Sequence, residues 1–191
     1  MTKIKLCGNF RLEDVTYLNQ VRPDFAGIVL SPGYRRSVSA ELARQMRATL
    51  NPAIALVGVF VNADLDEILA YRDLLDYVQL HGQESEELVA DLQKNGLKVI
   101  QVMQVDQQVP TRADYRLLDA GKGSGQTFDW KKIKTSSTPT ILAGGLKPTN
   151  LKEAIATVQP DVVDISSGSE VDGLKNLKQM QTLVSIARSQ I

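Results

Sequence analysis

The sequence is poor in the residue types that build disulfides and metal clusters. Its 191 residues include one cysteine and one histidine, and a single cysteine cannot form an internal disulfide or supply a thiolate metal cluster. Lys+Arg and Asp+Glu number 22 each, so the formal net charge is zero. Proteins that bind nucleic acids or membrane surfaces normally carry a basic stripe. We therefore expect neither kind of partner.

Long hydrophobic runs are also missing from the sequence. No apolar stretch is long enough to cross a bilayer, and the N-terminal segment Met1–Lys5 lacks the apolar core of a signal peptide. These features predict a cytoplasmic protein. Hydrophobic residues nevertheless make up 43% of the chain, enough for a core that buries roughly 70% of the unfolded surface.

Apolar strands alternate with amphipathic helices along the chain. Most predicted strands are almost continuously apolar, which is typical of parallel strands covered on both faces. The segment from Gln104 to Asp114 carries Pro110 and lacks an apolar stripe, so we expect a loop or a single turn there. The predicted strands are Lys3–Cys7, Phe25–Leu30, Ile54–Val61, Tyr77–Leu80, Lys98–Met103, Tyr115–Asp119, Thr140–Ala143 and Val162–Ile165, and the predicted helices are Leu12–Gln20, Ala40–Leu50, Leu65–Asp73, Ser85–Asn95, Asp129–Lys134, Asn150–Thr157 and Leu177–Ser189.

Eight strands with a helix after most of them predict an α/β fold, a compact (β/α)8 TIM barrel with a weak or missing fifth helix. A doubly wound open sheet is the alternative, but the sequence lacks a glycine-rich dinucleotide-binding turn after its first strand. The glycine-rich stretch Gly121–Gly125 lies between a strand and a short helix, so we interpret it as a catalytic-face loop. We expect one domain over residues 1–191.

Cys7 and Asp119 end the first and sixth predicted strands, where barrel enzymes build their active sites. A lone cysteine is more often a small buried hydrophobic residue, and its use as a base needs nearby positive charge, because a free thiol has a pKa near ~8.5. Arg35 and Arg36 could supply that charge. Asp119 is costly to bury without a purpose, although it could cap the backbone of residues 121–124. A thiol and a carboxylate at these strand ends could form an acid/base pair.

The loops after the seventh and eighth predicted strands favour a phosphate site. Gly144 and Gly145 let backbone N–H groups approach an anion, and Ser166, Ser167 and Gly168 add donors in the neighbouring slot. A short helix after Gly168 would point its positive end at the same spot. Tight turns chosen only for backbone geometry are the alternative interpretation.

Three further residues have a candidate role. Arg36 follows the second strand and suits recognition of a carboxylate, although it could equally be a solvated loop arginine. His81 ends the fourth strand, where it fits a ligand contact, but a lone histidine is more often structural. We expect Trp130 to pack its helix onto the barrel.

Several short motifs follow one another in a fixed order. The most specific is Leu117–Asp119 followed by Gly123–Trp130. The others are Lys5–Gly8 with Leu12–Asp14, Gly27–Val29, Ser31–Ser39, Val57–Asn62, Val78–Gly82, Leu142–Leu146 and Val163–Glu170. Through this ordered set the chain resembles, along essentially its whole length, the phosphoribosylanthranilate isomerase family of tryptophan biosynthesis.

The resemblance implies a barrel that converts N-(5-phosphoribosyl)anthranilate to 1-(2-carboxyphenylamino)-1-deoxy-D-ribulose 5-phosphate by an Amadori rearrangement. It makes Asp119 the general acid and Cys7 the general base, and places Arg36 at the anthranilate carboxylate and the loops of Gly144-Gly145 and Ser166–Gly168 at the phosphate. The reaction involves no redox change or hydrolysis, so we expect no metal and no cofactor. The expected partner is a small phosphosugar substrate, and the protein is expected to be a monomer or a homodimer.

The sequence departs from the family pattern in its first loop, where Asn9-Phe10 replace the usual Ile-Thr. The loop after Asp119 and the segment after Glu170 are also short. Two other functions stay open. A related aminoaldose-phosphate isomerase of histidine biosynthesis typically has aspartates in both catalytic slots, which Cys7 contradicts. A catalytically drifted phospho-ligand-binding barrel is supported only by Asn9-Phe10.

Overall fold

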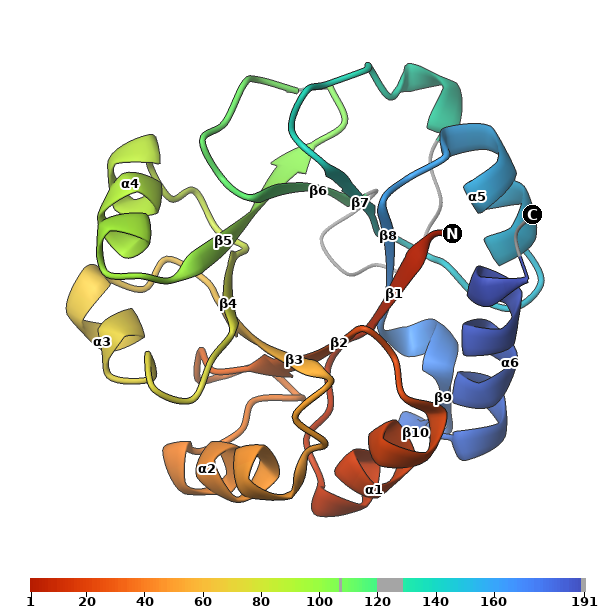
Figure 1. The fold of residues 1–191 in the computed structure, drawn as a ribbon, viewed down its shortest axis with the longest axis horizontal. Coiled ribbons are helices and arrows are strands. Elements are labelled where there is room, and N and C mark those ends of the chain that lie inside the picture. The colour runs from red at the N-terminus through yellow and green to blue at the C-terminus, as the bar shows by residue number, and fades with distance from the viewer. Residues whose placement is uncertain (107, 120–128, 190–191) are drawn as a thin grey trace.

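The computed structural model describes residues 1–106, 108–119 and 129–189. Eight parallel strands form a closed barrel in chain order, and β8 pairs back onto β1 (Figure 1). This confirms the predicted (β/α)8 architecture. The strands are β1 (Lys3–Leu6), β2 (Phe25–Val29), β3 (Ala55–Phe60), β4 (Tyr77–Leu80), β5 (Lys98–Gln104), β6 (Tyr115–Asp119), β7 (Thr140–Leu142) and β8 (Val162–Ile165).

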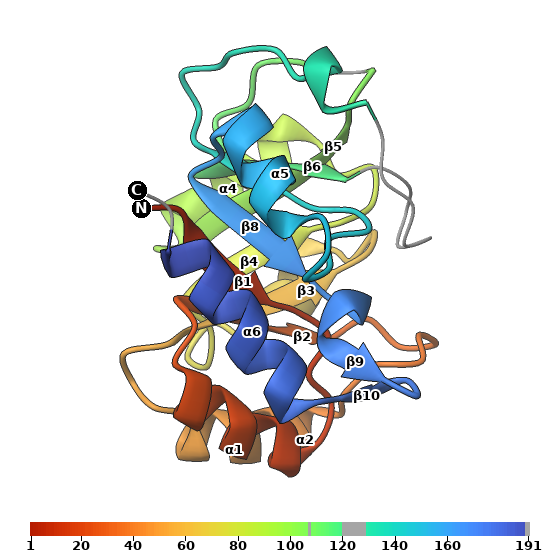
Figure 2. The same cartoon turned by 90° about the vertical axis from the view of Figure 1, so that its right-hand side faces the viewer.

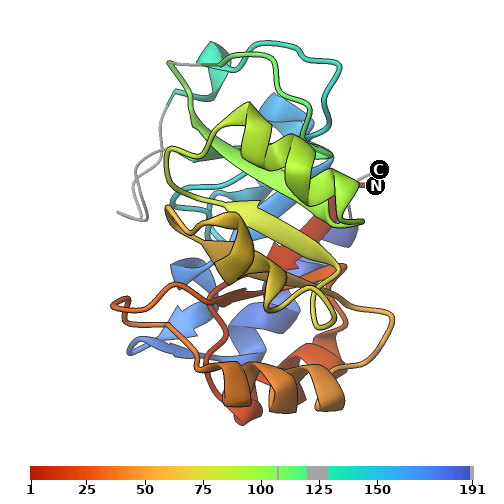
Figure 3. The same cartoon turned by 90° about the vertical axis from the view of Figure 1, so that its left-hand side faces the viewer.

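The α-helices pack around the outside of the barrel, and Figure 3 shows α2, α3 and α4 one above the other against the strands. Side-chain caps fix several of their starts: Ser39 accepts a hydrogen bond from the Leu42 amide, and Ser85 accepts one from the Leu88 amide. The helices in the described part of the chain are α1 (Leu12–Val21), α2 (Ala40–Thr49), α3 (Leu65–Leu69), α4 (Glu86–Lys94), α5 (Leu151–Val158) and α6 (Leu177–Arg188).

One sector of the helical ring is open. Between β5 and β6 the described residues 105–106 and 108–114 contain no helix, which confirms the prediction for the fifth connection. The helix predicted over Asp129–Lys134 is a single 3-10 turn, η1 (Trp130–Lys132). The Trp130 side chain packs against the hydrophobic core, as expected. Figure 1 shows this sector bounded by loops rather than by α-helices.

The segment after β8 differs from the prediction. The prediction of a short helix after Gly168 is wrong. A 3-10 turn, η2 (Ser167–Ser169), is followed there by a small antiparallel hairpin of β9 (Glu170–Val171) and β10 (Leu174–Lys175). Asp172 and Gly173 both have positive φ values, 51° and 78°, and this backbone geometry closes a two-residue hairpin.

Aromatic rings fill the N-terminal mouth of the barrel. Phe25, Tyr77 and Tyr115 are the first residues of β2, β4 and β6, and their rings pack at centroid distances of 5.4 to 6.1 Å. Alternate strands contribute to one layer in this fold. An apolar plug at this end leaves the C-terminal mouth for polar chemistry.

The loops that follow the strands extend from the end of the barrel opposite the two chain termini (Figure 2). At that end the hairpin β9–β10 lies beside the loop that follows β2. Within residues 1–106, 108–119 and 129–189, every helix is too short or too polar to span a membrane.

Candidate active site

Cys7, His81 and Asp119 lie at the same mouth of the barrel, on the inner faces of their strands. Side chains alternate between the two faces of a strand. Leu117 belongs to the inner core cluster, so Asp119, two residues later, points inward as well. Leu6 packs in the outer cluster, which leaves the inner face to Cys7. The predicted acid and base are thus both buried at the catalytic end of the fold.

Two glycines make room for Cys7 and the turn that follows it. A methyl group on Gly27 of β2 would lie 2.6 Å from the Cys7 Sγ, so only glycine leaves space for the thiol. Gly8 has a φ of 75°, and a methyl group there would lie 2.6 Å from Cδ of Arg36 and 3.0 Å from Oγ of Ser166. Arg36 and the loop after β8 therefore flank the backbone immediately after Cys7.

Asn9, one of the two residues that depart from the family pattern, anchors the first loop. Its side chain is fully buried, and Nδ2 donates to the carbonyl oxygens of Leu6 at 2.8 Å and of Gly27 at 2.9 Å. The Asn9 amide donates to the same Gly27 carbonyl at 3.0 Å. Phe10 donates its amide to the Asp14 carboxylate at the start of α1. The substituted loop is tied to β2 and to α1 by its own hydrogen bonds.

A charged pair lies inside the barrel next to Cys7. Lys5 is fully buried, and its Nζ donates to Oδ2 of Asp164 at 2.8 Å. The two residues are register partners in the β1–β8 pairing. Lysines and aspartates are almost never fully buried unless they are paired. Sequence reasoning gave neither residue a role; the signal was that a lysine two positions before Cys7 must share its inward face.

The charges around Cys7 act in opposite directions on its thiol. Burial raises the pKa of Cys7, the Lys5 ammonium lowers it, and the Asp164 carboxylate raises it again, for a net increase. Lys175 adds a smaller lowering effect. We expected Arg35 and Arg36 to supply the positive charge that lowers the pKa of the thiol. The charge comes chiefly from Lys5, which lies two residues before Cys7 on β1.

His81 bridges Gln79 and the side of the site that holds Asp119. Its Nε2 lies 3.8 Å from Oδ2 of Asp119, and its Nδ1 lies 3.0 Å from the Gln79 amide nitrogen. An amide nitrogen can only donate, so Nδ1 accepts and the ring proton resides on Nε2. Burial lowers the pKa of His81 against the opposing effect of Asp119. The imidazole is therefore neutral near pH 7 and presents an N–H group towards Asp119.

Arg36 is held by Glu170 in a bidentate pair. Its Nε donates to Oε1 of Glu170 at 2.7 Å and its Nη2 donates to Oε2 at 2.8 Å. Arg35 donates to the same carboxylate at 2.9 Å and to the Gly173 carbonyl at 2.8 Å. These contacts fasten the loop after β2 to the hairpin β9–β10, side by side in Figure 2. Arg36 is not the solvated loop arginine of the alternative interpretation.

Lys175 joins this rim cluster to the loop after β8. Its Nζ donates to the Ser166 carbonyl at 2.9 Å, to Oγ of Ser169 at 3.0 Å and to Oε1 of Glu170 at 3.1 Å. One buried ammonium thus fixes both a loop of the expected phosphate site and the carboxylate that holds Arg36. Sequence reasoning missed Glu170 and Lys175 because each acts through side-chain hydrogen bonds that no local sequence pattern predicts.

The two predicted phosphate loops touch each other. A methyl group on Gly168 would lie 2.0 Å from the Leu146 carbonyl oxygen, so this close approach requires glycine. Gly144 and Gly145 both adopt positive φ values, 88° and 63°, which glycine adopts without steric cost. A surface hollow next to these loops is lined by Lys147, Pro148, Thr149, Ser167, Gly168, Glu170 and Gln179.

Part of the predicted site lies outside the described residues. The cap at Gly121–Ser124 and the motif residues Gly123–Phe128 fall in the segment 120–128. Among the residues that the structure does describe, no group of three or more histidine, cysteine, aspartate or glutamate side chains is placed to hold a metal ion.

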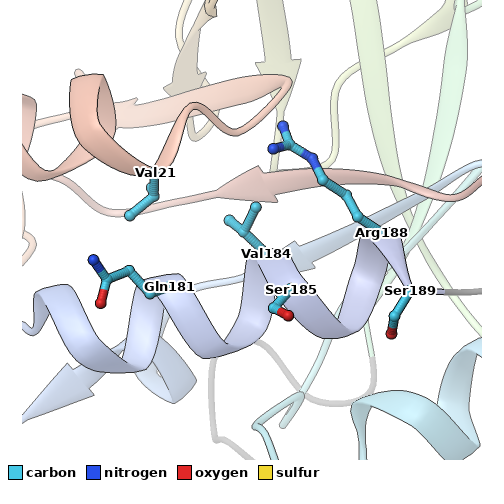
Figure 4. Close-up of a pocket in the computed structure, with 6 residues that line it drawn as sticks. All are labelled: Val21, Gln181, Val184, Ser185, Arg188 and Ser189. Carbon is cyan, nitrogen blue, oxygen red and sulfur yellow. The ribbon is translucent and has the colours of Figure 1, made fainter.

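A second hollow lies away from these residues, against α6. It is lined by Val21 at the end of α1 and by Gln181, Val184, Ser185, Arg188 and Ser189 (Figure 4). Arg188 is the sole ionisable residue of the six, and its guanidinium donates to the Arg22 carbonyl. Such a lining offers no acid/base pair.

Comparisons with known proteins identify the family of this chain. The family model described as N-(5'-phosphoribosyl)anthranilate isomerase matches residues 4–186. The isomerase of that name from Lacticaseibacillus casei (strain BL23) is 42% identical over 194 residues, covering 100% of this chain and 97% of the relative. The crystal structure of the Thermus thermophilus isomerase matches with a TM-score of 0.87 at 32% identity, covering 98% and 99% of the two chains.

A solved isomerase in complex with reduced 1-(o-carboxyphenylamino)-1-deoxyribulose 5-phosphate is also similar. It matches with a TM-score of 0.83 at 30% identity and covers 100% of both chains. The matches extend over the whole barrel and include the strand ends that bear Cys7 and Asp119. The chain belongs to the N-(5'-phosphoribosyl)anthranilate isomerase family.

Proposed function

We propose that the chain catalyses the Amadori rearrangement of N-(5-phosphoribosyl)anthranilate to 1-(2-carboxyphenylamino)-1-deoxy-D-ribulose 5-phosphate, a cytoplasmic step of tryptophan biosynthesis. The observation that carries the proposal is the family match over residues 4–186, joined to a buried thiol and a buried carboxylate at one mouth of the barrel. The reaction moves protons within a single substrate, so the protein's own side chains suffice for it.

Asp119 acts first, as the general acid. Its proton goes to the ribose ring oxygen, the bond between that oxygen and C1 breaks, and the anilino nitrogen supplies the electron pair that forms the protonated Schiff base. The neutral imidazole of His81, with its Nε2–H 3.8 Å from Oδ2 of Asp119, orients this carboxyl group. A positioned acid of this kind typically contributes a factor of about 10²–10⁴ in rate.

Cys7 acts second, as the general base. Its thiolate takes the proton from C2 of the Schiff base, and the C2–H electron pair forms the C1–C2 double bond of an enolamine as the iminium charge is neutralised. Tautomerisation of the enolamine then gives the C2 ketone. The methyl-sized gap at Gly27 seats the sulfur without displacing β2.

Charged groups at the rim hold the two ends of the substrate. Glu170 uses the Nε/Nη2 edge of Arg36, so Nη1 meets the anthranilate carboxylate. Backbone amides of Gly144, Gly145 and the Ser166–Gly168 loop receive the phosphate. Anchoring the phosphate away from C1 and C2 orients the reacting atoms, and orientation of this kind lowers the barrier of the chemical steps.

Turnover is measured as the loss of fluorescence of phosphoribosylanthranilate. We expect Cys7→Ser and Asp119→Asn each to lower kcat by about 10²–10⁴ while the unfolding temperature stays near that of the wild type. Glu153→Gln, at an exposed position on α5, is the matched control and keeps the wild-type rate. Near-wild-type kcat in either site variant overturns that residue's role.

The same assay separates the other functions. A drifted phospho-ligand-binding barrel binds the reduced product analogue but shows no turnover with the purified wild type. An aminoaldose-phosphate isomerase turns over its own substrate in competition with phosphoribosylanthranilate. Cys7 in the first catalytic slot, and the hydrogen bonds of Asn9 that organise the first loop, favour the isomerase named by the family.

A further inference from the structure

Lys5 and Asp164 form a buried ion pair at the site that the proposed chemistry leaves unused. Both side chains are buried, and the Nζ–Oδ2 distance is 2.8 Å. Replacing a buried ion pair by apolar residues is often neutral or stabilising. Stability alone therefore gives a weak reason for a lysine at this position, and a role towards its neighbour is the stronger one.

The neighbour that Lys5 shares with Asp164 is Cys7. Lys5 and Cys7 point to the same face of β1 because they are two residues apart, and the Lys5 ammonium lowers the pKa of the Cys7 thiol. The ammonium has three donor protons, so one can serve Asp164 while another serves the sulfur. The Cys7 amide is bonded to the carbonyl of Ile165, next to Asp164, so the backbone fixes the three residues together.

Asp164 is bound on one side only. Its Oδ2 accepts from Lys5, whereas its Oδ1 is buried and has no hydrogen-bond partner among the described residues. An unsatisfied buried acceptor is costly. This carboxylate therefore depends on Lys5 for its compensation, and it competes with the sulfur for the same ammonium.

Other charges near Cys7 come from the loops above it. Arg36 lies over Gly8 but is committed to Glu170, and Lys175 on β10 is committed to Ser166, Ser169 and Glu170. Gly27 of β2, which packs against Cys7, has no charged side chain. Lys5 is thus the cation that shares the inner face of β1 with Cys7 and lowers the pKa of its thiol most.

We propose that Lys5 is a positioning residue for the base: its ammonium, held by Asp164 on the inner face of the barrel, donates to the Cys7 thiolate and stabilises it for proton removal from C2. This inference rests on the proposed function. In the resting site the ammonium neutralises Asp164, and when the thiolate forms, the same ammonium is shared between two anions. Asp164 moderates the effect, so its removal strengthens the bond from Lys5 to the sulfur.

The test uses the single cysteine of the chain, which makes alkylation by iodoacetamide report on one thiol. The rate is measured against pH for the wild type, Lys5→Met, Asp164→Asn and the control Lys3→Met, whose lysine is exposed on the same strand. We expect Lys5→Met to move the midpoint of the curve upward by about one pH unit or more, which lowers the rate about tenfold below the midpoint. Asp164→Asn moves it downward, and Lys3→Met leaves it unchanged.

A purely structural role for Lys5 predicts something else. Loss of the ion pair would then lower the unfolding temperature in both variants, with no opposite displacement of the two alkylation curves. An unchanged midpoint in folded Lys5→Met overturns the proposal. If Lys5→Met does not fold, the Asp164→Asn variant alone tests the proposal. An alkylation midpoint that moves upward or stays unchanged in that variant overturns the proposal equally.

Alkylation needs no substrate, so the result stands apart from the proposed function. Turnover of phosphoribosylanthranilate supplies the second measurement: the acidic limb of the kcat/KM profile should move upward in Lys5→Met by the same amount as the alkylation midpoint. Displaced alkylation curves with an inactive wild type would contradict the proposed function and support the link between Lys5 and Cys7.

Discussion

Two lysines are buried at the catalytic end of this barrel, and their charges are compensated in different ways. Lys5 lies inside the barrel with one carboxylate, Asp164, to itself. Lys175 lies at the rim, where Glu170 is shared with Arg35 and Arg36. Burial lowers the pKa of each lysine, but Asp164 and Cys7 more than reverse this for Lys5, whose pKa is raised. For Lys175 the pKa stays lowered, since Glu170 compensates only part of the burial and Arg36 adds to it.

The difference shows that the number of anions per cation, rather than burial, decides how firmly each lysine keeps its proton. Inside the barrel one cation faces one carboxylate and one thiol. At the rim three cations face one carboxylate, which leaves a surplus of positive charge beside the loops of the proposed phosphate site. In our proposal the anionic groups of the substrate complete the rim cluster, whereas the inner pair is already complete without substrate.

The largest expected effect comes from removing the carboxylate of each cluster. Asp164→Ala leaves Lys5 charged inside the barrel with no carboxylate, so we expect the free energy of unfolding to fall by about 3–5 kcal/mol. Glu170→Ala leaves Lys175 bonded to Ser166 and Ser169, and the expected loss is only about 1–3 kcal/mol. Urea denaturation measures both values, and equal losses would remove the distinction between the clusters.

An intermediate effect is expected on substrate binding. Glu170→Gln breaks one or both bonds that hold Arg36, so the guanidinium loses its alignment for the anthranilate carboxylate. We expect KM to rise about tenfold, equivalent to about 1.4 kcal/mol, with a smaller change in kcat. Steady-state kinetics with Glu153→Gln as control provide the measurement. A fall in KM would mean that Glu170 competes with the substrate for Arg36.

The barrel was predictable because its strands are apolar on both faces, and almost continuous apolar runs of this kind are visible in the sequence. Strand bounds differ from the prediction by a residue or so, and the missing fifth helix followed from Pro110 and the lack of an apolar stripe. Two of the details that differ have identifiable reasons. A hairpin of two-residue strands (β9–β10) has no detectable period, and α3 ends at Leu69 although polar and apolar residues continue to alternate beyond it.

The candidate site was predictable at strand ends and not in its ionic contacts. Position in a barrel marks Cys7 and Asp119, and their roles remain predictions. The partner of Lys5 is 159 positions away in the chain, and that of Arg36 is 134 positions away, so no local pattern identifies either. The sequence pattern therefore indicates Arg35 and Arg36, which follow the second strand, as the positive charge near the thiol, whereas Lys5 lowers its pKa most.

The smallest expected effect is a difference between the two lysines in alkaline solution. A folded-state pKa above the ordinary 10.5 means that Lys5 stabilises the fold fully below pH 10.5, and that this contribution is lost as pH rises through the raised value. Lys175 behaves oppositely: between its lowered pKa and 10.5 the unfolded chain binds more protons, so the free energy of unfolding rises with pH. Each slope is at most about 1.4 kcal/mol per pH unit. The measurement is denaturant unfolding at several pH values above 8. Lys175→Met should remove a rise of the free energy of unfolding with pH, and Lys5→Met should remove a fall. Slopes of the same sign would show that both lysines are governed by burial alone.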